Sequence, residues 1–420
     1  MRIGMVLEAP FPPDIRVEKE IRALETQGHA VTLLCAHKEN QPTEDCYGKT
    51  RIVRFHHEGV RDGVTKKLDV LYHWITSRNR AWEIAIGQFV EKNHVQALHV
   101  HDLPLVPTGL KVAREYRIPL VFDMHEIYPV MIRDKIDVRT DTRKRINTKA
   151  HSMLFSPRWW DRVEQRSVQQ ADQIIVVVEE SRDRLLRMGI SGDKISVVLN
   201  AEDIDRFLSL PEQVEVASKY QNNFLIGYVG GVDNANRGLD NLVRAVPLLL
   251  QRIPNLHLLV VGDGGLRPAI EKLVLDLNMK NAVTFAGWVP FEEVAAYIRA
   301  LDVAVIPHII NDHTNHTIPH KLFQYIALGK LVVASDIVPI RRILQDTNAG
   351  IIVSEWSPQG FADAIVQAHA LIQSGQHDPE KQVRVLRKNY GFQAVAEPLL
   401  KLYEGLEKSG TKKAQGHSAT

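Results

Sequence analysis

Short apolar runs alternate with longer amphipathic stretches along most of the chain. Runs of this length are typical of buried strands, and the stretches between them have the spacing of helices that cover a parallel sheet. The pattern therefore predicts an α/β fold. We expect strands at residues 3–7, 31–34, 52–55, 97–100, 120–122, 174–178 and 195–198, and again at 225–229, 256–261, 283–285, 303–306, 331–334 and 351–353.

The second half of the chain repeats the scheme of the first, which predicts two similar α/β domains in tandem. Strand character is lost between residues 200 and 223, where we place the boundary. Ligands of open parallel sheets bind at the carboxyl ends of strands, so the polar turns after residues 7 and 229 are expected to face a shared cleft. We expect an N-terminal domain at 1–200, a linker at 201–222, a C-terminal domain at 223–390, a helix at 391–407 and a disordered tail at 408–420.

Composition is that of an ordinary globular enzyme. The chain has 420 residues, of which 45% are hydrophobic and 24% charged, enough to form two full cores. The formal net charge of +2 argues against nucleic-acid binding and favours a small-molecule partner. Cys35 and Cys46 are the only cysteines, so neither a zinc motif nor a disulfide framework is predicted, and a reducing cytoplasm fits.

No segment is predicted to cross a membrane. The first apolar run reaches Pro10 after about seven residues, and no later stretch approaches about 18 uncharged apolar residues. Residues 130–167 carry ten arginines and lysines, with an aromatic cluster that ends at Trp159 and Trp160. Two interpretations stay open: a basic amphipathic patch for an anionic membrane surface, or a solvated helix whose tryptophans pack on the core.

The turn after residues 225–229 has the composition of a phosphate site. Gly230 and Gly231 follow the strand, and Arg237 with Gly238 opens an amphipathic helix. Backbone N–H groups, a helix N-terminus and a cation together can hold a diphosphate. Glycine turns between strand and helix also serve a purely structural role in many folds, so this motif alone leaves both interpretations open.

Two further turns of the second half have a similar character. Gly262 and Gly264 lie in a G-D-G-G turn that lacks the spacing of a dinucleotide motif, and we expect them on the base or ribose side of a nucleotide. After residues 303–306 comes a loop rich in His, Asn and Thr, followed by a helix at 320–328 that ends at Gly329. Three such turns in one domain predict a nucleotide site, with Gln324 able to bond to hydroxyls.

The order of these motifs resembles the family-4 retaining glycosyltransferases. The resemblance covers nearly the whole chain and includes the segments at residues 11–34, 99–110 and 121–129 in the first half. It implies the GT-B fold, in which two Rossmann-like parallel-sheet domains face a cleft and the last helix returns toward the first domain. It also implies that a nucleotide sugar is the donor.

The resemblance assigns the diphosphate contact to Arg237. The family's companion arginine, directly after the strand-end glycine, is replaced here by Gly231 or Val232. Lys321, or Arg16 of the first domain, could supply the missing cation.

The family also carries two glutamates eight positions apart, and their positions here are His316, near the donor sugar, and Gln324, on the ribose hydroxyls. Gln324 can still donate and accept hydrogen bonds. The resemblance places further donor-binding residues in this domain, with the phosphate held by loop amides in the last four of them: Trp288, Val289, Thr317, His320, Lys321 and Leu322. Pro319 has no N–H and is excluded.

In the first domain, His125 matches a histidine that closes over the sugar in this family. We expect it to orient the donor or to bond to the acceptor; a core histidine is the alternative. Asp123 and Glu126 beside it favour an open polar site. His101 and Asp102 follow another strand, and we expect them on the acceptor side together with Arg16 and Glu126.

The predicted function is retaining transfer of a sugar from a nucleotide sugar to a cell-envelope or exopolysaccharide acceptor, glycan or lipid-linked. His125, Arg237 and His316 are the expected catalytic residues. We expect no cofactor and no metal ion, because no D-x-D motif follows a strand and Arg237 with the helix dipoles can neutralise the leaving group. The expected location is cytoplasmic, with peripheral attachment to the inner membrane left open. The alternatives are a nucleotide-sugar-binding protein with weakened catalysis, motivated by Gly231, His316 and Gln324, and a GT-B-like UDP-sugar 2-epimerase.

Overall fold

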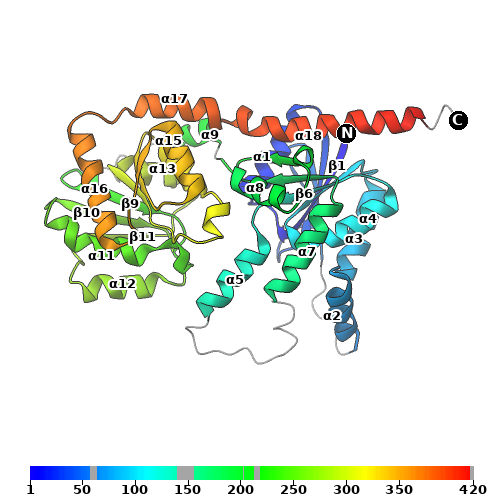
Figure 1. Ribbon diagram of the computed structural model, residues 1–420, viewed down its shortest axis with the longest axis horizontal. Coiled ribbons are helices and arrows are strands. Elements are labelled where there is room, and N and C mark those ends of the chain that lie inside the picture. The colour runs from blue at the N-terminus through cyan, green and yellow to red at the C-terminus, as the bar shows by residue number, and fades with distance from the viewer. Residues whose placement is uncertain (57–63, 140–155, 202, 212–217, 417–420) are drawn as a thin grey trace. The chain divides into compact units, whose positions relative to one another are not determined.

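The computed structural model describes residues 1–56, 64–139, 156–201, 203–211 and 218–416 (Figure 1). The chain forms two compact units. Unit 1 consists of Met1–Leu199 together with Ala396–Thr420, and unit 2 consists of Asn200–Val395. Both are α/β units, as the alternation of apolar runs and amphipathic stretches predicts.

Unit 1 is built on an eight-stranded sheet with the order β3-β4-β2-β1-β5-β6-β7-β8. All neighbouring strands are parallel except β3 and β4, which form an antiparallel hairpin at the edge. The strands are β1 (Arg2–Pro10), β2 (Ala30–Ala36), β3 (Glu44–Tyr47), β4 (Thr50–Phe55), β5 (Ala97–His101), β6 (Leu120–Met124), β7 (Gln173–Val176) and β8 (Ile195–Val197).

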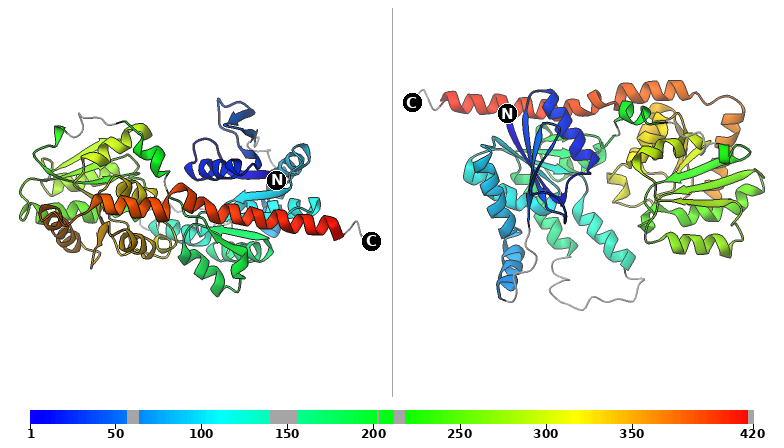
Figure 2. Two further views of the ribbon diagram at one scale, coloured as in Figure 1. Left: turned by 90° about the horizontal axis from the view of Figure 1, so that it is seen from above. Right: turned by 180° about the vertical axis from the view of Figure 1, so that it is seen from behind.

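The central strands β5 and β6 are buried along their whole length and are apolar except for His99, His101 and Asp123. The helices of unit 1 are α1 (Ile15–Thr26), α2 (Val64–Thr76), α3 (Arg80–Lys92), α4 (Val106–Tyr116), α5 (Tyr128–Arg139), α7 (Pro157–Gln170), α8 (Glu179–Arg187) and, from Ala396 on, α18 (Phe392–Gly416). In two views α2, α5 and α7 extend from unit 1 in the same direction (Figures 1 and 2). Trp160 lies in the core and Trp159 packs against it, so both tryptophans of α7 follow the packing interpretation.

Unit 2 is built on a six-stranded sheet, parallel between all its named strands, with the order β11-β10-β9-β12-β13-β14. Its strands are β9 (Phe224–Val229), β10 (Leu256–Val261), β11 (Val283–Gly287), β12 (Val303–Ile306), β13 (Leu331–Ala334) and β14 (Gly350–Ile352). Its helices are α9 (Ile204–Leu208), α11 (Leu239–Leu250), α12 (Arg267–Asp276), α13 (Phe291–Ala300), α14 (His320–Ala327), α15 (Val338–Thr347), α16 (Pro358–Gln373) and α17 (Pro379–Tyr390). The order places the ends of β9 and β12 next to each other.

Every strand expected from the apolar runs is present, and β3 is the addition. Its four residues, EDCY, are polar and mostly exposed, so they carry no apolar signal. Helix α18 runs to Gly416, beyond residue 407 where the sequence predicts its end. The rest of the expected tail, residues 417–420, lies outside the described residues, as do residues 140–155 of the basic segment. Within the described part of the chain no helix is long and apolar enough to span a bilayer.

Candidate active site

The turns that follow β9, β10 and β12 come together at one edge of the unit 2 sheet. A Cβ atom at Gly262 would overlap the carbonyl oxygen of Gly230, so only glycine lets the first two turns touch. Gly238 has a φ of +63° and caps α11, and a Cβ there would overlap the carbonyl oxygen of Pro307, which follows β12. The glycines predicted from the sequence are thus needed for the three turns to meet.

Lys321 brings an amine into this group of turns. It lies in the first turn of α14, its side chain is buried, and a Cβ at Gly230 would collide with its Nζ atom. The Nζ atom is 3.7 Å from the centroid of the Tyr228 ring. Among the described residues no hydrogen-bond acceptor reaches it. Burial, together with repulsion from Arg237, holds the pKa of Lys321 well below its usual range.

Other potentially cationic groups surround Lys321. Arg237 is about one-third exposed and its nearest acid is Asp233, 3.7 Å away. His308, just after β12, is buried with its Nε2 atom unpartnered, and burial and the charges of Lys321 and Arg237 keep its pKa well below the usual range. Three nitrogen-bearing side chains therefore converge at the ends of β9 and β12 with Asp233 as the nearest acid. This arrangement is suited to an anion.

The loop before α14 is held by its own side chains. His316 donates through Nδ1 to the carbonyl oxygen of Asp312 at 2.7 Å, and the N–H of Thr314 donates to Oδ1 of Asn311. The N–H of Leu322, which the resemblance assigns to a phosphate, donates to the carbonyl of Pro319 at 3.1 Å. The helix has no side-chain cap, and a bond of this 3₁₀ type can satisfy one of its first amides. Thr317 and His320 are half-buried, and Gln324 is buried one turn further along α14.

Trp288 stands at the end of β11 and is 74% exposed, more than any other large apolar residue among those described. Val289 beside it is half-buried. An exposed indole at a strand end offers a flat surface for stacking.

In unit 1, the carboxylate of Asp123 is the centre of a buried histidine network. His101 Nδ1 and His125 Nε2 each lie 2.8 Å from Asp123 Oδ2, and His99 Nε2 lies 3.4 Å from the same atom. Tyr403 of α18 donates to His99 Nδ1 at 2.9 Å. Asp123 is fully buried and His125 is buried too, so the expectation of an open polar site here is wrong. Of these two residues and Glu126, only Glu126 is exposed.

The pKa values of the groups in this network are shifted in different directions. Burial opposes the charge on His125, but attraction to Asp123 outweighs it and raises the pKa of His125 to about 9. Burial also opposes the charge on Asp123, yet His125 and the three hydrogen bonds hold its pKa well below the usual range. Burial and the Asp123 charge raise the pKa of Glu20 well above its usual range. The result is an Asp123–His125 ion pair beside a carboxyl group with a raised pKa.

Polar groups at the ends of β1 and β5 border this pair. Arg16 hydrogen-bonds to Asp14, which raises the pKa of the guanidinium despite its burial. Asp102 has a φ of +62°, a backbone conformation that non-glycine residues rarely adopt, and its N–H donates to the carbonyl of Asp123. Such outliers are often found at functional sites. The structure thus brings Arg16, His101, Asp102 and His125 to one edge of the unit 1 sheet.

Four of these groups have the donor atoms of a metal site. The ligand atoms of Glu20, His99, His101 and Asp123 all lie within 4.8 Å of one another. However, Asp123 Oδ2 is only 2.8 Å from His101 Nδ1. Ligands around a tetrahedral ion are about 3.4 Å apart for bonds of about 2.1 Å. The spacing is that of a hydrogen bond, and we derive no metal chemistry from this cluster.

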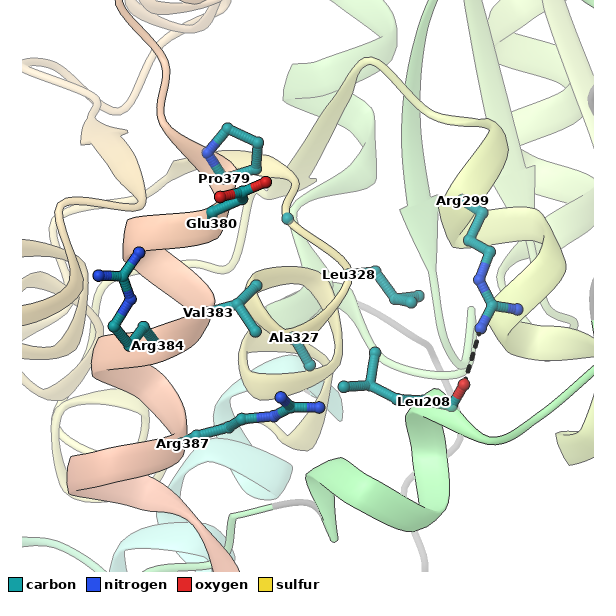
Figure 3. A pocket seen from close by; sticks show the side chains of 10 residues that line it. Leu208, Arg299, Ala327, Leu328, Pro379, Glu380, Val383, Arg384 and Arg387 are labelled. Atoms are coloured by element: carbon teal, nitrogen blue, oxygen red, sulfur yellow. Dashed lines mark hydrogen bonds between the residues drawn. The ribbon is translucent and has the colours of Figure 1, made fainter.

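A pocket on unit 2 lies elsewhere. Its lining combines the C-terminal end of α14 with α17 and the end of α9, and Arg299 in it donates to the carbonyl of Leu208 (Figure 3). Since α14 starts at the strand ends and runs back along the sheet, this pocket is at the opposite edge from Lys321. It is not part of the candidate active site.

Two parallel-sheet α/β units of this kind form the GT-B fold, and matches to known proteins show that the chain is a glycosyltransferase. Residues 15–206 match the model of Glycosyltransferase Family 4, and residues 223–370 match that of Glycosyl transferases group 1. The chain belongs to the family-4, group 1 glycosyltransferases, as its motifs predict.

Similar proteins include named glycosyltransferases, and several solved structures share the fold. The chain is 27% identical over 433 residues to the phosphatidyl-myo-inositol mannosyltransferase of Mycobacterium tuberculosis, covering 98% of this chain and 99% of the relative. It is 21% identical to a glycosyltransferase of Methanocaldococcus jannaschii, over 56% of this chain and 59% of the relative. Sucrose-phosphate synthase from Thermosynechococcus elongatus has the same fold (TM-score 0.75, 18% identity, 97% and 100% covered). So does HepE of Anabaena in complex with UDP (TM-score 0.67, 14% identity, 96% and 100% covered).

Three residues of the strand-end sites in units 1 and 2 are not predicted from the sequence. Glu20 and Tyr403 reach the Asp123 network from distant parts of the chain, and no local motif marks them. His308 was one of 18 histidines, and only its position directly after a strand could have marked it.

Proposed function

We propose that the chain transfers a sugar, with retention of configuration, from a nucleotide sugar to a cell-envelope or exopolysaccharide acceptor. The observation that carries this proposal is the unpartnered amine of Lys321 beside Arg237 and His308 at the ends of β9 and β12. A diphosphate is an anion that would satisfy all three. The UDP-bound structure of HepE supports a nucleotide as its source.

In this proposal Lys321 supplies the cation that the family's missing arginine would provide. With Arg237 it neutralises the charge that develops on the departing nucleoside diphosphate, and the N-terminus of α11, whose cap residue Gly238 has no side chain, adds its dipole. These groups do the work for which other transferases use a divalent ion, so we propose a reaction without metal or cofactor. Trp288 would stack on the base, and Gln324 would bond to the ribose.

Unit 1 contributes the charged His125. An imidazolium held by Asp123 can donate a hydrogen bond to an oxygen of the sugar or the acceptor, but it cannot act as a base. Arg16, Asp102 and Glu126 would recognise the acceptor. We propose that the acceptor is a glycan or lipid-linked molecule and that the protein contacts the inner membrane surface peripherally; the name of the mycobacterial relative, a phosphatidylinositol mannosyltransferase, favours such an acceptor.

A panel of UDP-, GDP-, ADP- and dTDP-sugars tests the donor site. We expect hydrolysis or transfer with one of them, and a loss of at least about 100-fold in kcat/KM for Arg237→Ala, as for a group that stabilises transition-state charge. The matched control is Arg244→Ala, an exposed arginine on α11, which should leave turnover unchanged. Full activity of Arg237→Ala would exclude the assignment.

The second candidate is a nucleotide-sugar-binding protein with weakened catalysis. His316 and Gln324 favour it, because both expected acids are absent and His316 is tied to its own loop. Calorimetry that finds tight nucleotide binding without turnover on any acceptor would support it. Restoring the acid with Gln324→Glu would then show whether this residue limits turnover.

A further inference from the structure

The amine of Lys321 lies over the aromatic ring of Tyr228, near the end of β9. Its Nζ atom is 3.7 Å from the ring centroid, well inside the distance of about 6 Å at which the face of an aromatic ring attracts a cation. Tyr228 is fully buried, and its hydroxyl donates to the carbonyl of Gly231 at 2.9 Å. The ring is therefore held at both ends, by the strand and by the glycine turn.

The sheet opens beside Tyr228. The pairing of β9 with β12 extends to Gly227, whereas its pairing with β10 continues to Val229. Where β9 and β12 separate, the N–H of Val229 donates to the hydroxyl of Tyr325 at 2.8 Å. Tyr325 follows Lys321 by four positions on α14, so this bond fixes that face of the helix against β9. It places the side chain of Lys321 beside Tyr228.

These contacts confine a side chain that is otherwise flexible. A free lysine loses the freedom of four rotatable bonds when its amine binds a ligand, and a side chain that is already held loses less. The amine of Lys321 lies between the Tyr228 ring and the backbone of Gly230, where a Cβ atom would collide with it. Tyr228 thus connects the amine to the glycine turn of the candidate phosphate site.

We propose that Tyr228 is a positioning residue of the donor site, whose ring holds the amine of Lys321 where the diphosphate binds. An aromatic ring suits this role better than an acid, because a carboxylate would pair with the ammonium group and repel the phosphates. The proposal rests on the proposed function, since it concerns the same site, and adds the residue that prepares Lys321 for the ligand.

Graded fluorination of the ring at position 228 tests the proposal. Calorimetry with UDP, GDP, ADP and dTDP first selects the nucleotide that binds the full-length protein most tightly. Tyr228→Phe should weaken its binding no more than about threefold, because the ring stays. Phenylalanine with one, two and three fluorines keeps nearly the same outline but loses electron density on its face. The dissociation constant should rise at each step, to about tenfold above that of Tyr228→Phe.

The same series in the Lys321→Met background shows whether the ring acts through the amine. We expect the dissociation constant to stay constant within about twofold along it, because the cation is gone. The matched control is Tyr220→Leu in the wild-type background. Tyr220 is a buried tyrosine of unit 2 that precedes β9 and has the Nζ atom of Lys219 5.4 Å from its ring centroid. This variant should bind the nucleotide as the wild type does, and thermal unfolding shows that each variant is folded.

Three outcomes would overturn the proposal, and they separate it from the proposed function. If Lys321→Met weakens binding but fluorination has no effect, the ring does not hold the amine and the diphosphate site stands. A fluorination effect of equal size in the Lys321→Met background would mean that the ring acts through packing alone. If Lys321→Met binds as the wild type does, the amine is outside the site, and the assignment of the diphosphate to Lys321 fails as well.

Discussion

The amine of Lys321 is buried beside two other nitrogen-bearing side chains, and its charge state should depend on the ligand. Burial and Arg237 lower its pKa in the free protein, and a bound diphosphate would raise it. Nucleotide binding should therefore take up a proton, and affinity should fall as pH rises through the pKa of the bound state. Calorimetry of the nucleotide diphosphate between pH 6.5 and 9, in buffers of different ionisation enthalpy, measures both effects.

His308 could contribute to the same proton uptake, since its pKa is lowered too. Lys321→Met should weaken binding by about ten- to a hundredfold, the range for one charge-assisted hydrogen bond, and abolish the part of the uptake that the amine contributes. His308→Gln should remove only the part that the imidazole contributes. Binding of the Lys321→Met variant that equals the wild type at every pH would remove the amine from the site.

The Asp123–His125 pair makes a prediction for stability. The pKa of His125 is raised to about 9 from an unfolded value of 6.5, so its contribution is complete below pH 6.5 and is lost as pH rises toward 9. The shift corresponds to up to about 3 kcal/mol. Chemical unfolding of the wild type and His125→Gln at several pH values should show a difference that shrinks over this range. A difference that grows with pH would contradict the ion pair.

For single residues, the sequence predicts which side chains come together better than it predicts how buried they are. The spacing of the motifs placed Gly230, Gly262, Arg237 and Lys321 around one set of turns, and the structure brings these turns together. Burial is a product of tertiary packing, so neither the loss of solvent at Lys321 nor the closed surroundings of Asp123 follows from local sequence. Leu322 illustrates the same limit, because its amide is used by a neighbouring carbonyl.

Helix α18 is connected to the Asp123 network of unit 1 through Tyr403. Its hydroxyl donates to His99, and both side chains are fully buried. Tyr403→Phe should destabilise the protein by about 1–2 kcal/mol, because the His99 nitrogen would be left without a partner. Tyr116→Phe, at an exposed tyrosine of α4, is the control and should have little effect. Thermal unfolding of both variants gives the comparison, and equal values would mean that this hydrogen bond adds nothing.

Helices and strands differ in how well their sequence patterns predict them. Buried parallel strands such as β5 and β9 are short apolar runs and were all predicted, whereas β3 pairs through its backbone alone and its polar side chains gave no signal. Helix α2 shows the converse. Its apolar residues Leu71, Trp74 and Ile75 are exposed, and only the structure shows this.

In the whole molecule, two units with separate cores divide the work of a transferase. The groups proposed to bind the diphosphate belong to unit 2 and the His125 network belongs to unit 1, so donor affinity and sugar transfer should be separable by substitution. His125→Ala should leave the dissociation constant of the nucleoside diphosphate within about twofold and lower kcat at least about 100-fold, the usual loss for a group that donates a proton or hydrogen bond in the transition state. Arg237→Ala should both weaken binding of the nucleoside diphosphate and lower kcat. Calorimetry measures the dissociation constant and initial rates give kcat, both on the same preparations. Thermal unfolding confirms that each variant is folded. If His125→Ala weakened nucleotide binding as much as Arg237→Ala does, the diphosphate contact could not be assigned to unit 2 alone.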